Sequence, residues 1–127
     1  MIITIRFMKL LGDIKGEFMY QNKDLYVIDF RNVNYYLEMH NVIKEALDFP
    51  EYYGCNWSAL WDCLTEMVGD PMNIEILGLD VIERRFGVET SGKLLEILKR
   101  IMHYRDDKYA EIIHIYLVGE NQRIEIK

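Results

Sequence analysis

The chain has 127 residues, of which 50% are hydrophobic and 28% are charged, a composition that fits one folded domain and not a disordered chain. Asp and Glu number 21 against 15 Lys and Arg, and the formal net charge of −6 argues against nucleic acid as a partner and favours a basic protein. No apolar run approaches the roughly 20 residues of a membrane span and no secretion signal is evident, so we expect no membrane partner and a cytoplasmic location.

The first elements in chain order are short strands. Residues alternate between apolar and polar at Ile2–Met8, which predicts a strand, and Glu17–Gln21 is a second candidate. Both lie in an N-terminal extension, residues 1–24, whose edge strands are able to pair within the chain or between two chains. Leu25–Asp29 is a strong short strand and begins the core.

Two helices are predicted next. Apolar residues recur at spacings of three and four over residues 34–47, and Phe49-Pro50 ends this helix because proline disfavours helical geometry in the residue before it. In the loop that follows, we expect Gly54 to supply a positive φ. Asn56 is a candidate N-cap for a second helix that extends to about Val68.

The second half of the chain alternates strands and helices. The predicted elements are a strand at Asn73–Leu77, a short helix capped by Asp80 and ending near Gly87, a helix from about Thr90 to Tyr104, a strand at Ala110–Val118 and an edge strand at Gln122–Lys127. The strand at Ala110–Val118 is nearly all apolar at its centre, which predicts that both of its faces are covered.

Strands joined through helices predict a parallel sheet with right-handed crossovers. The predicted fold class is therefore α/β, with three parallel strands packed by about four helices. We expect a single domain over residues 1–127, with its core at residues 25–118.

The chain shows no catalytic or metal-binding pattern. His40 and His114 lie among apolar residues and are expected to be structural, whereas His103 is expected to be exposed near a helix end. If Cys55 and Cys63 lay on one helix, they would be about 12 Å apart, too far for a disulfide, and reduced thiols fit the cytosol. With no nucleotide-binding loop and no zinc motif, we predict no cofactor, no metal and no small-molecule substrate.

The segment Phe49–Leu64, FPEYYGCNWSALWDCL, has the composition of a protein interface. Interfaces favour Tyr and Trp, which bury a large area at low entropic cost. Leu60 and Leu64 are expected in the core, and for Trp57 both a core and a surface position remain open. Trp61 lies at the edge of the apolar stripe and is expected to be half exposed.

This segment resembles the barstar family of ribonuclease inhibitors. The resemblance rests on Pro50-Glu51-Tyr52-Tyr53-Gly54, then Asn56, then Ala59-Leu60-Trp61-Asp62-Cys63-Leu64. It implies the barstar-like fold, a three-stranded parallel sheet packed by helices. It also implies that the loop and helix block the active site of a small basic ribonuclease of the barnase type.

The resemblance also assigns roles to individual residues. Asp62 matches the central acid that enters the phosphate site, and Tyr52 matches the aromatic residue that packs against the catalytic histidine. The partner-binding positions implied in this way are Tyr52, Gly54, Asn56, Trp57, Ser58, Trp61 and Asp62.

Two positions depart from the family pattern. Ser58 stands where the family has a second acid, one helical turn before Asp62. A further acid on the last helix aligns with Arg100 or its neighbours, and the nearby carboxylate is Glu96. Fewer acids predict weaker electrostatic complementarity to a barnase-like site.

The sequence leaves three functions open. The first is inhibition of an extracellular barnase-type ribonuclease by a protein that is not an enzyme. The second is an interaction, antitoxin or immunity module of the same fold with a different basic protein partner. The third is a small enzyme that uses Cys55 or Cys63, and the absence of a basic neighbour for Cys63 argues against it.

Overall fold

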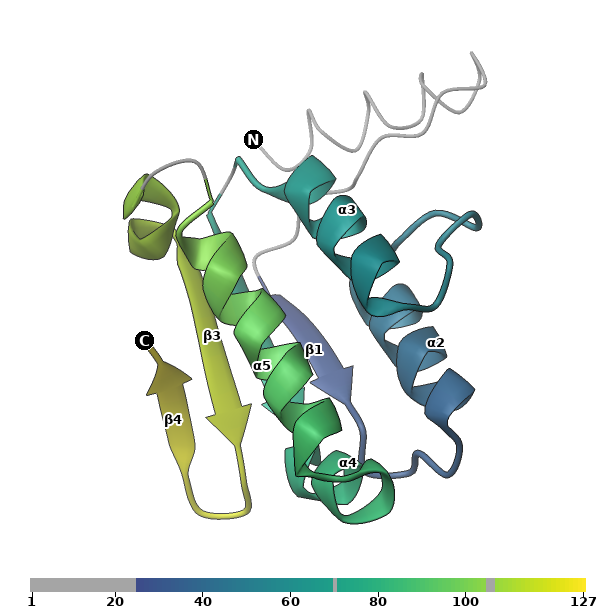
Figure 1. Ribbon diagram of the computed structural model, residues 1–127. Coiled ribbons are helices and arrows are strands. Elements are labelled where there is room, and N and C mark those ends of the chain that lie inside the picture. The colour runs from purple at the N-terminus through teal and green to yellow at the C-terminus, as the bar shows by residue number, and fades with distance from the viewer. Residues whose placement is uncertain (1–24, 70, 105–106) are drawn as a thin grey trace.

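The computed structural model describes residues 25–69, 71–104 and 107–127 (Figure 1). The strands predicted at Ile2–Met8 and Glu17–Gln21 lie outside the described residues. The elements are β1 (Leu25–Asp29), α2 (Tyr36–Ala46), α3 (Trp57–Met67), β2 (Met72–Leu77), α4 (Leu79–Phe86), α5 (Val88–Met102), a 3-10 helix η1 (Asp107–Glu111), β3 (Ile113–Val118) and β4 (Arg123–Ile126).

The sheet has the spatial order β1-β2-β3-β4. The first three strands are parallel, with Ile28 opposite Ile76 and Ile74 opposite Ile115. β4 returns antiparallel beside β3, as expected for the predicted edge strand. The predicted α/β class, with three parallel strands and four α-helices, is confirmed in the described part of the chain.

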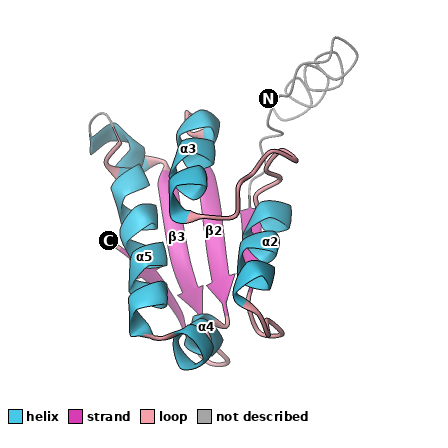
Figure 2. Cartoon of the chain, turned by 45° about the vertical axis from the view of Figure 1, so that its right-hand side comes forward, coloured by secondary structure: helices cyan, strands magenta, loops and turns pink. Residues whose placement is uncertain are grey.

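The three long helices cover one face of this sheet. Each parallel crossover is expected to be right-handed, and both step in the same direction across the sheet, which places their helices on the same side. Figures 1 and 2 show α2, α3 and α5 side by side on that face, with α4 at one end of the sheet. This arrangement brings α3 next to α5, although 20 residues separate them in sequence.

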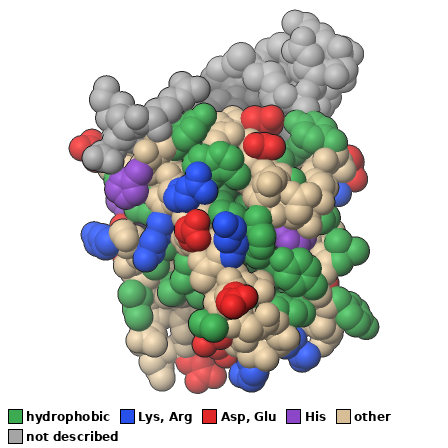
Figure 3. Space-filling view, viewed as in Figure 1, with side chains coloured by type: hydrophobic (Ala, Val, Ile, Leu, Met, Phe, Trp, Pro, Cys, Tyr) green, Lys and Arg blue, Asp and Glu red, His purple; other side chains and the backbone are tan. Residues whose placement is uncertain are grey.

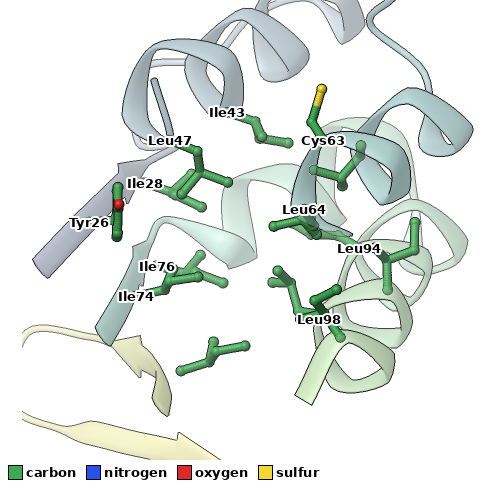
Figure 4. Close-up of a cluster of buried hydrophobic side chains, with 14 of the residues drawn as sticks. Tyr26, Ile28, Ile43, Leu47, Cys63, Leu64, Ile74, Ile76, Leu94 and Leu98 are labelled. Carbon is green, nitrogen blue, oxygen red and sulfur yellow. The ribbon is translucent and has the colours of Figure 1, made fainter. Parts of the chain in front are cut away.

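The core fills the space between this helical layer and the sheet. Figure 4 shows side chains from α2, α3 and α5 meeting those of the strands. Its fully buried members include Ile28, Ile43, Leu64, Ile74 and Leu98, each no more than 1% exposed. The predicted core positions Leu60 and Leu64 are both buried, which confirms the apolar stripe of α3.

The opposite face of the sheet corrects one prediction. Ile113 and Ile115 of β3 are buried, but the alternate residues His114 and Tyr116 are only partly buried, so the strand is not covered equally on both faces. Polar contacts occupy this face: the Arg123 guanidinium lies 3.5 Å from the centre of the Tyr116 ring. The edge strand β4 supplies these contacts, which the apolar sequence of β3 alone did not indicate.

Two element boundaries also differ from prediction. The residues just before Ile113 form η1 instead of extending the strand, so β3 begins later than predicted. The N-cap of α4 is Gly78, in the left-handed region with φ 77°, and Asp80 lies in the first helical turn. A β-carbon at Gly78 would lie 2.7 Å from the Arg31 backbone nitrogen, so glycine is required there by both conformation and space.

We predict that Gly78→Ala lowers the free energy of unfolding by about 2 kcal/mol or more, because it combines a left-handed backbone with a steric clash. Gly92→Ala is the control, because Gly92 lies within α5 and a β-carbon there meets nothing within 4 Å. That substitution is expected to stabilise the protein by about 0.5–1 kcal/mol. Urea unfolding of both variants measures the difference, and equal stabilities would contradict the assignment of Gly78.

Candidate functional site

The segment singled out by the sequence forms a loop, residues 48–56, followed by α3. The loop closes with a backbone hydrogen bond from Tyr53 N to Pro50 O of 3.0 Å. Asp48 and Cys55 have positive φ, 58° and 54°, whereas Gly54 is not among the positive-φ residues, so that prediction is wrong. Gly54 is instead confined by space, because a β-carbon there would lie 3.2 Å from Asn56 Nδ2 and 3.5 Å from Ala59 Cβ.

Asn56 is the N-cap of α3, as predicted. Its Oδ1 accepts a hydrogen bond of 2.8 Å from the Ala59 backbone N–H, which satisfies one of the free donors of the first turn. Its Nδ2 donates to the Gly54 carbonyl at 3.2 Å. One side chain therefore joins the end of the loop to the start of the helix and holds both in a defined orientation.

A buried pair of side chains attaches the loop to α2. His40 is 0% exposed, and its Nδ1 lies 2.8 Å from the hydroxyl of Tyr53, which is itself buried. Aromatic rings surround the imidazole, with the Trp57 ring centre at 5.0 Å and the Tyr36 ring centre at 5.4 Å. The structural role predicted for His40 is confirmed, and its Nε2 has no hydrogen-bond partner in the described structure.

The neighbouring Tyr52 is presented to solvent. Its side chain is 68% exposed, and its hydroxyl donates to Glu66 Oε2 at 3.3 Å. Desolvation and the Glu66 carboxylate raise the pKa of this hydroxyl, which is in any case protonated and able to donate at neutral pH. The two adjacent tyrosines thus have opposite environments: Tyr53 anchors the loop from inside, while Tyr52 lies on the outside.

The predicted partner-binding positions lie on the loop and the first turns of α3. Tyr52, Gly54, Asn56, Ser58 and Asp62 are exposed, and Trp57 and Trp61 are partly buried. Ser58 and Asp62 are four residues apart, so they lie one turn apart on the same side of the helix. The half-exposure expected for Trp61 is observed.

A groove lies between α3 and α5. It has a volume of about 230 Å³ and is lined by Trp57, Ser58, Trp61, Asp62, Lys93, Ile97 and Arg100. Four of these were predicted as contact positions, and Arg100 was recognised as a departure from the family pattern. Lys93 and Ile97 were missed, because no sequence signal showed which side of α5 would face α3.

The charged side chains of α5 frame this groove. Figure 3 shows Lys and Arg side chains over α5 beside hydrophobic side chains that lie toward α3. The Arg100 guanidinium lies 4.6 Å from the centre of the Trp61 ring, within the range of a cation–π interaction. Lys93 Nζ lies 3.7 Å from Glu96 Oε1. The face is therefore of mixed charge, with an acid on α3 and cations on α5.

The described residues offer little for catalysis. Cys63 is buried, and the polar contacts of Cys55 are with Asn41 Oδ1 at 3.8 Å and the Tyr53 carbonyl at 3.9 Å, neither of which is a base for a thiol. Neither cysteine forms a disulfide, as predicted. Within the same residues, no three His, Cys, Asp or Glu side chains gather to hold a metal, and no helix is long and apolar enough to cross a membrane.

The fold and the site together define a class of protein: a small α/β domain that exposes aromatic and charged side chains from one loop and one helix. The family model described as "Barstar (barnase inhibitor)" matches residues 24–116. The chain is also 33% identical over 85 residues to the Bacillus subtilis (strain 168) protein named "Putative ribonuclease inhibitor YrdF", which covers 67% of this chain and 89% of that protein. The chain belongs to the barstar family.

We predict that this site makes the stability of the protein depend on pH through His40. Burial lowers the pKa of His40, so the folded protein favours the neutral ring and the unfolded chain binds the proton first as the pH falls. The full stability is expected above the unfolded pKa of about 6.5, with a loss of up to about 1.4 kcal/mol per pH unit below it.

Urea unfolding between pH 8 and pH 5 measures this dependence. His40→Gln is the comparison, because glutamine does not titrate in this range. It should be less stable at pH 8 and should show a smaller loss on acidification. An equal slope in the parent and in His40→Gln would assign the pH dependence to other groups.

Proposed function

We propose that this protein is an inhibitor that binds a barnase-type ribonuclease and covers its active site with the loop at residues 48–56 and the first turns of α3. Membership of the barstar family supports a ribonuclease as the partner, and the name of the B. subtilis relative agrees with it. The protein itself has no catalytic role in this proposal. A cytoplasmic location fits two cysteines that form no disulfide.

The observation that carries the proposal is the placement of Asp62. It is exposed on α3, it lines the groove, and no cation of the described residues lies within 4.0 Å of its carboxylate. A carboxylate in this position is available to the cations of a ribonuclease site, where it takes the place of an RNA phosphate. Trp61 lines the same groove, and Tyr52 contacts Glu66 one turn further along α3, so both supply aromatic area of the kind that interfaces favour.

The overall charge supports the same proposal. A protein with a net charge of −6 attracts a basic enzyme over a long range, which raises the rate of encounter at low salt. The rigid attachment of the loop through His40 and Asn56 lowers the entropic cost of binding, since the contact residues are already ordered.

A second function is favoured by the departures on the same face. Ser58 contributes no charge, and α5 presents Lys93 and Arg100 to the groove. Both features weaken complementarity to a uniformly basic site. They support an antitoxin or immunity module whose basic partner differs from barnase-type enzymes.

Calorimetric titration with a barnase-type ribonuclease, combined with an RNA-cleavage assay, separates the two functions. We predict one-to-one binding that abolishes cleavage and weakens as salt is raised from 50 to 300 mM. Tight binding without loss of cleavage, or no binding at micromolar concentration, would contradict the inhibitor proposal and direct the search to another basic partner.

Asp62→Ala is predicted to weaken binding by more than about 2 kcal/mol, which is about 30-fold, because it leaves the cations of the enzyme buried without a partner. Glu120→Ala is the matched control. It removes the same charge from an exposed position in the turn between β3 and β4, away from the groove, and should change affinity less than threefold. Equal affinities of Asp62→Ala and Glu120→Ala would remove Asp62 from the site.

A further inference from the structure

The groove between α3 and α5 contains two opposite charges that are not paired with each other. Asp62 lies on the α3 side and Arg100 on the α5 side, and both line the same cavity of about 230 Å³. Within the described residues, no ion pair of 4.0 Å or less involves either of them. The groove thus has one available anion and one available cation, with the indole of Trp61 under the cation.

The position of Arg100 is held by packing. Its guanidinium lies over the Trp61 ring at 4.6 Å, and its helix is fixed to the core through Ile97 and Ile101, which are 2% and 0% exposed. Lys93 lies at the same wall, but Glu96 at 3.7 Å offsets part of its charge. Arg100 is therefore the cation of the groove that a partner would have to accommodate.

A partner that covers this groove and keeps Asp62 and Arg100 apart must supply an opposite charge to each of them. Burying an ionised group without an opposite charge or hydrogen-bond partners costs more than the surrounding contacts return, whereas a matched pair is tolerated. A uniformly basic surface would pair with Asp62 but would meet Arg100 with a like charge. A guanidinium also offers a planar set of donors that fits a carboxylate in two-point geometry.

We infer that Arg100 is a specificity-determining residue, and that the natural ribonuclease partner presents an Asp or Glu carboxylate to it beside the cation that it presents to Asp62. This inference rests on the proposed function and adds the chemistry of the partner's surface. In this arrangement the inhibitor discriminates between ribonucleases through one attractive pair and one repulsive pair.

The test uses a barnase-type ribonuclease and a set of its single variants, in which each basic residue around the active site is replaced in turn by glutamate. Each enzyme is titrated calorimetrically with the parent protein, with Arg100→Gln and with Lys99→Gln. Lys99 is the matched control, because it is exposed on the same helix and does not line the groove.

At least one glutamate replacement is expected to bind the parent tenfold or more tightly than the unmodified enzyme does. This gain should persist with Lys99→Gln and fall below threefold with Arg100→Gln. The inference is overturned if no replacement improves binding, or if the gain is the same with Arg100→Gln as with the parent.

The two proposals fail in different ways. If Asp62→Ala binds the unmodified enzyme as tightly as the parent does, the assigned site of the proposed function is wrong. If Asp62→Ala is weak but no glutamate replacement gains affinity, the inhibitor function stands and only the partner carboxylate is wrong. A parent protein that binds no enzyme of the set contradicts the proposed function, and the assignment of the partner carboxylate falls with it.

Discussion

The handedness and direction of the two crossovers determine most of this structure. Because both connections between parallel strands step the same way across the sheet, α2, α3 and α5 must share one face. In the described part of the chain the core forms on that side, and α3 and α5 become neighbours. The groove that contains Asp62 and Arg100 exists only because of this neighbourhood, since the two residues lie on elements separated by β2 and α4.

Two polar contacts, one buried and one exposed, give the candidate site its shape. The hydrogen bond between His40 and Tyr53 fastens the loop to α2, and the Asn56 cap sets the direction in which α3 leaves the loop. Both contacts hold the loop and the start of α3 in place before a partner binds. The entropic cost of ordering Tyr52 and Asp62 on binding is therefore lower. The loop is therefore tied to the stability of the core, and acidification that protonates His40 would loosen the binding segment together with the fold.

The charge pattern of the site combines an acid on α3 with cations on α5. Family membership supports a ribonuclease partner, and the aromatic and acidic residues of α3 agree with it. The α5 wall has the opposite charge, and Arg100 is stacked on an aromatic residue of the site itself. A change confined to one helix can in this way redirect an inherited surface toward a different enzyme, because electrostatic complementarity sets specificity more strongly than it sets affinity.

The sequence alone determined the local features. Periodicity and capping chemistry identified the helices, the Asn56 cap and the buried stripe of α3, because these depend on residues three or four positions apart. It did not determine which residues of the loop take a positive φ, since Asp48 and Cys55 adopt it, whereas Gly54 is confined by space. Tertiary structure decided the partial exposure of β3, because a strand pattern does not report how many of its faces are covered. It also decided that Lys93 and Arg100 lie beside α3, because a helix pattern does not report which element packs next to it.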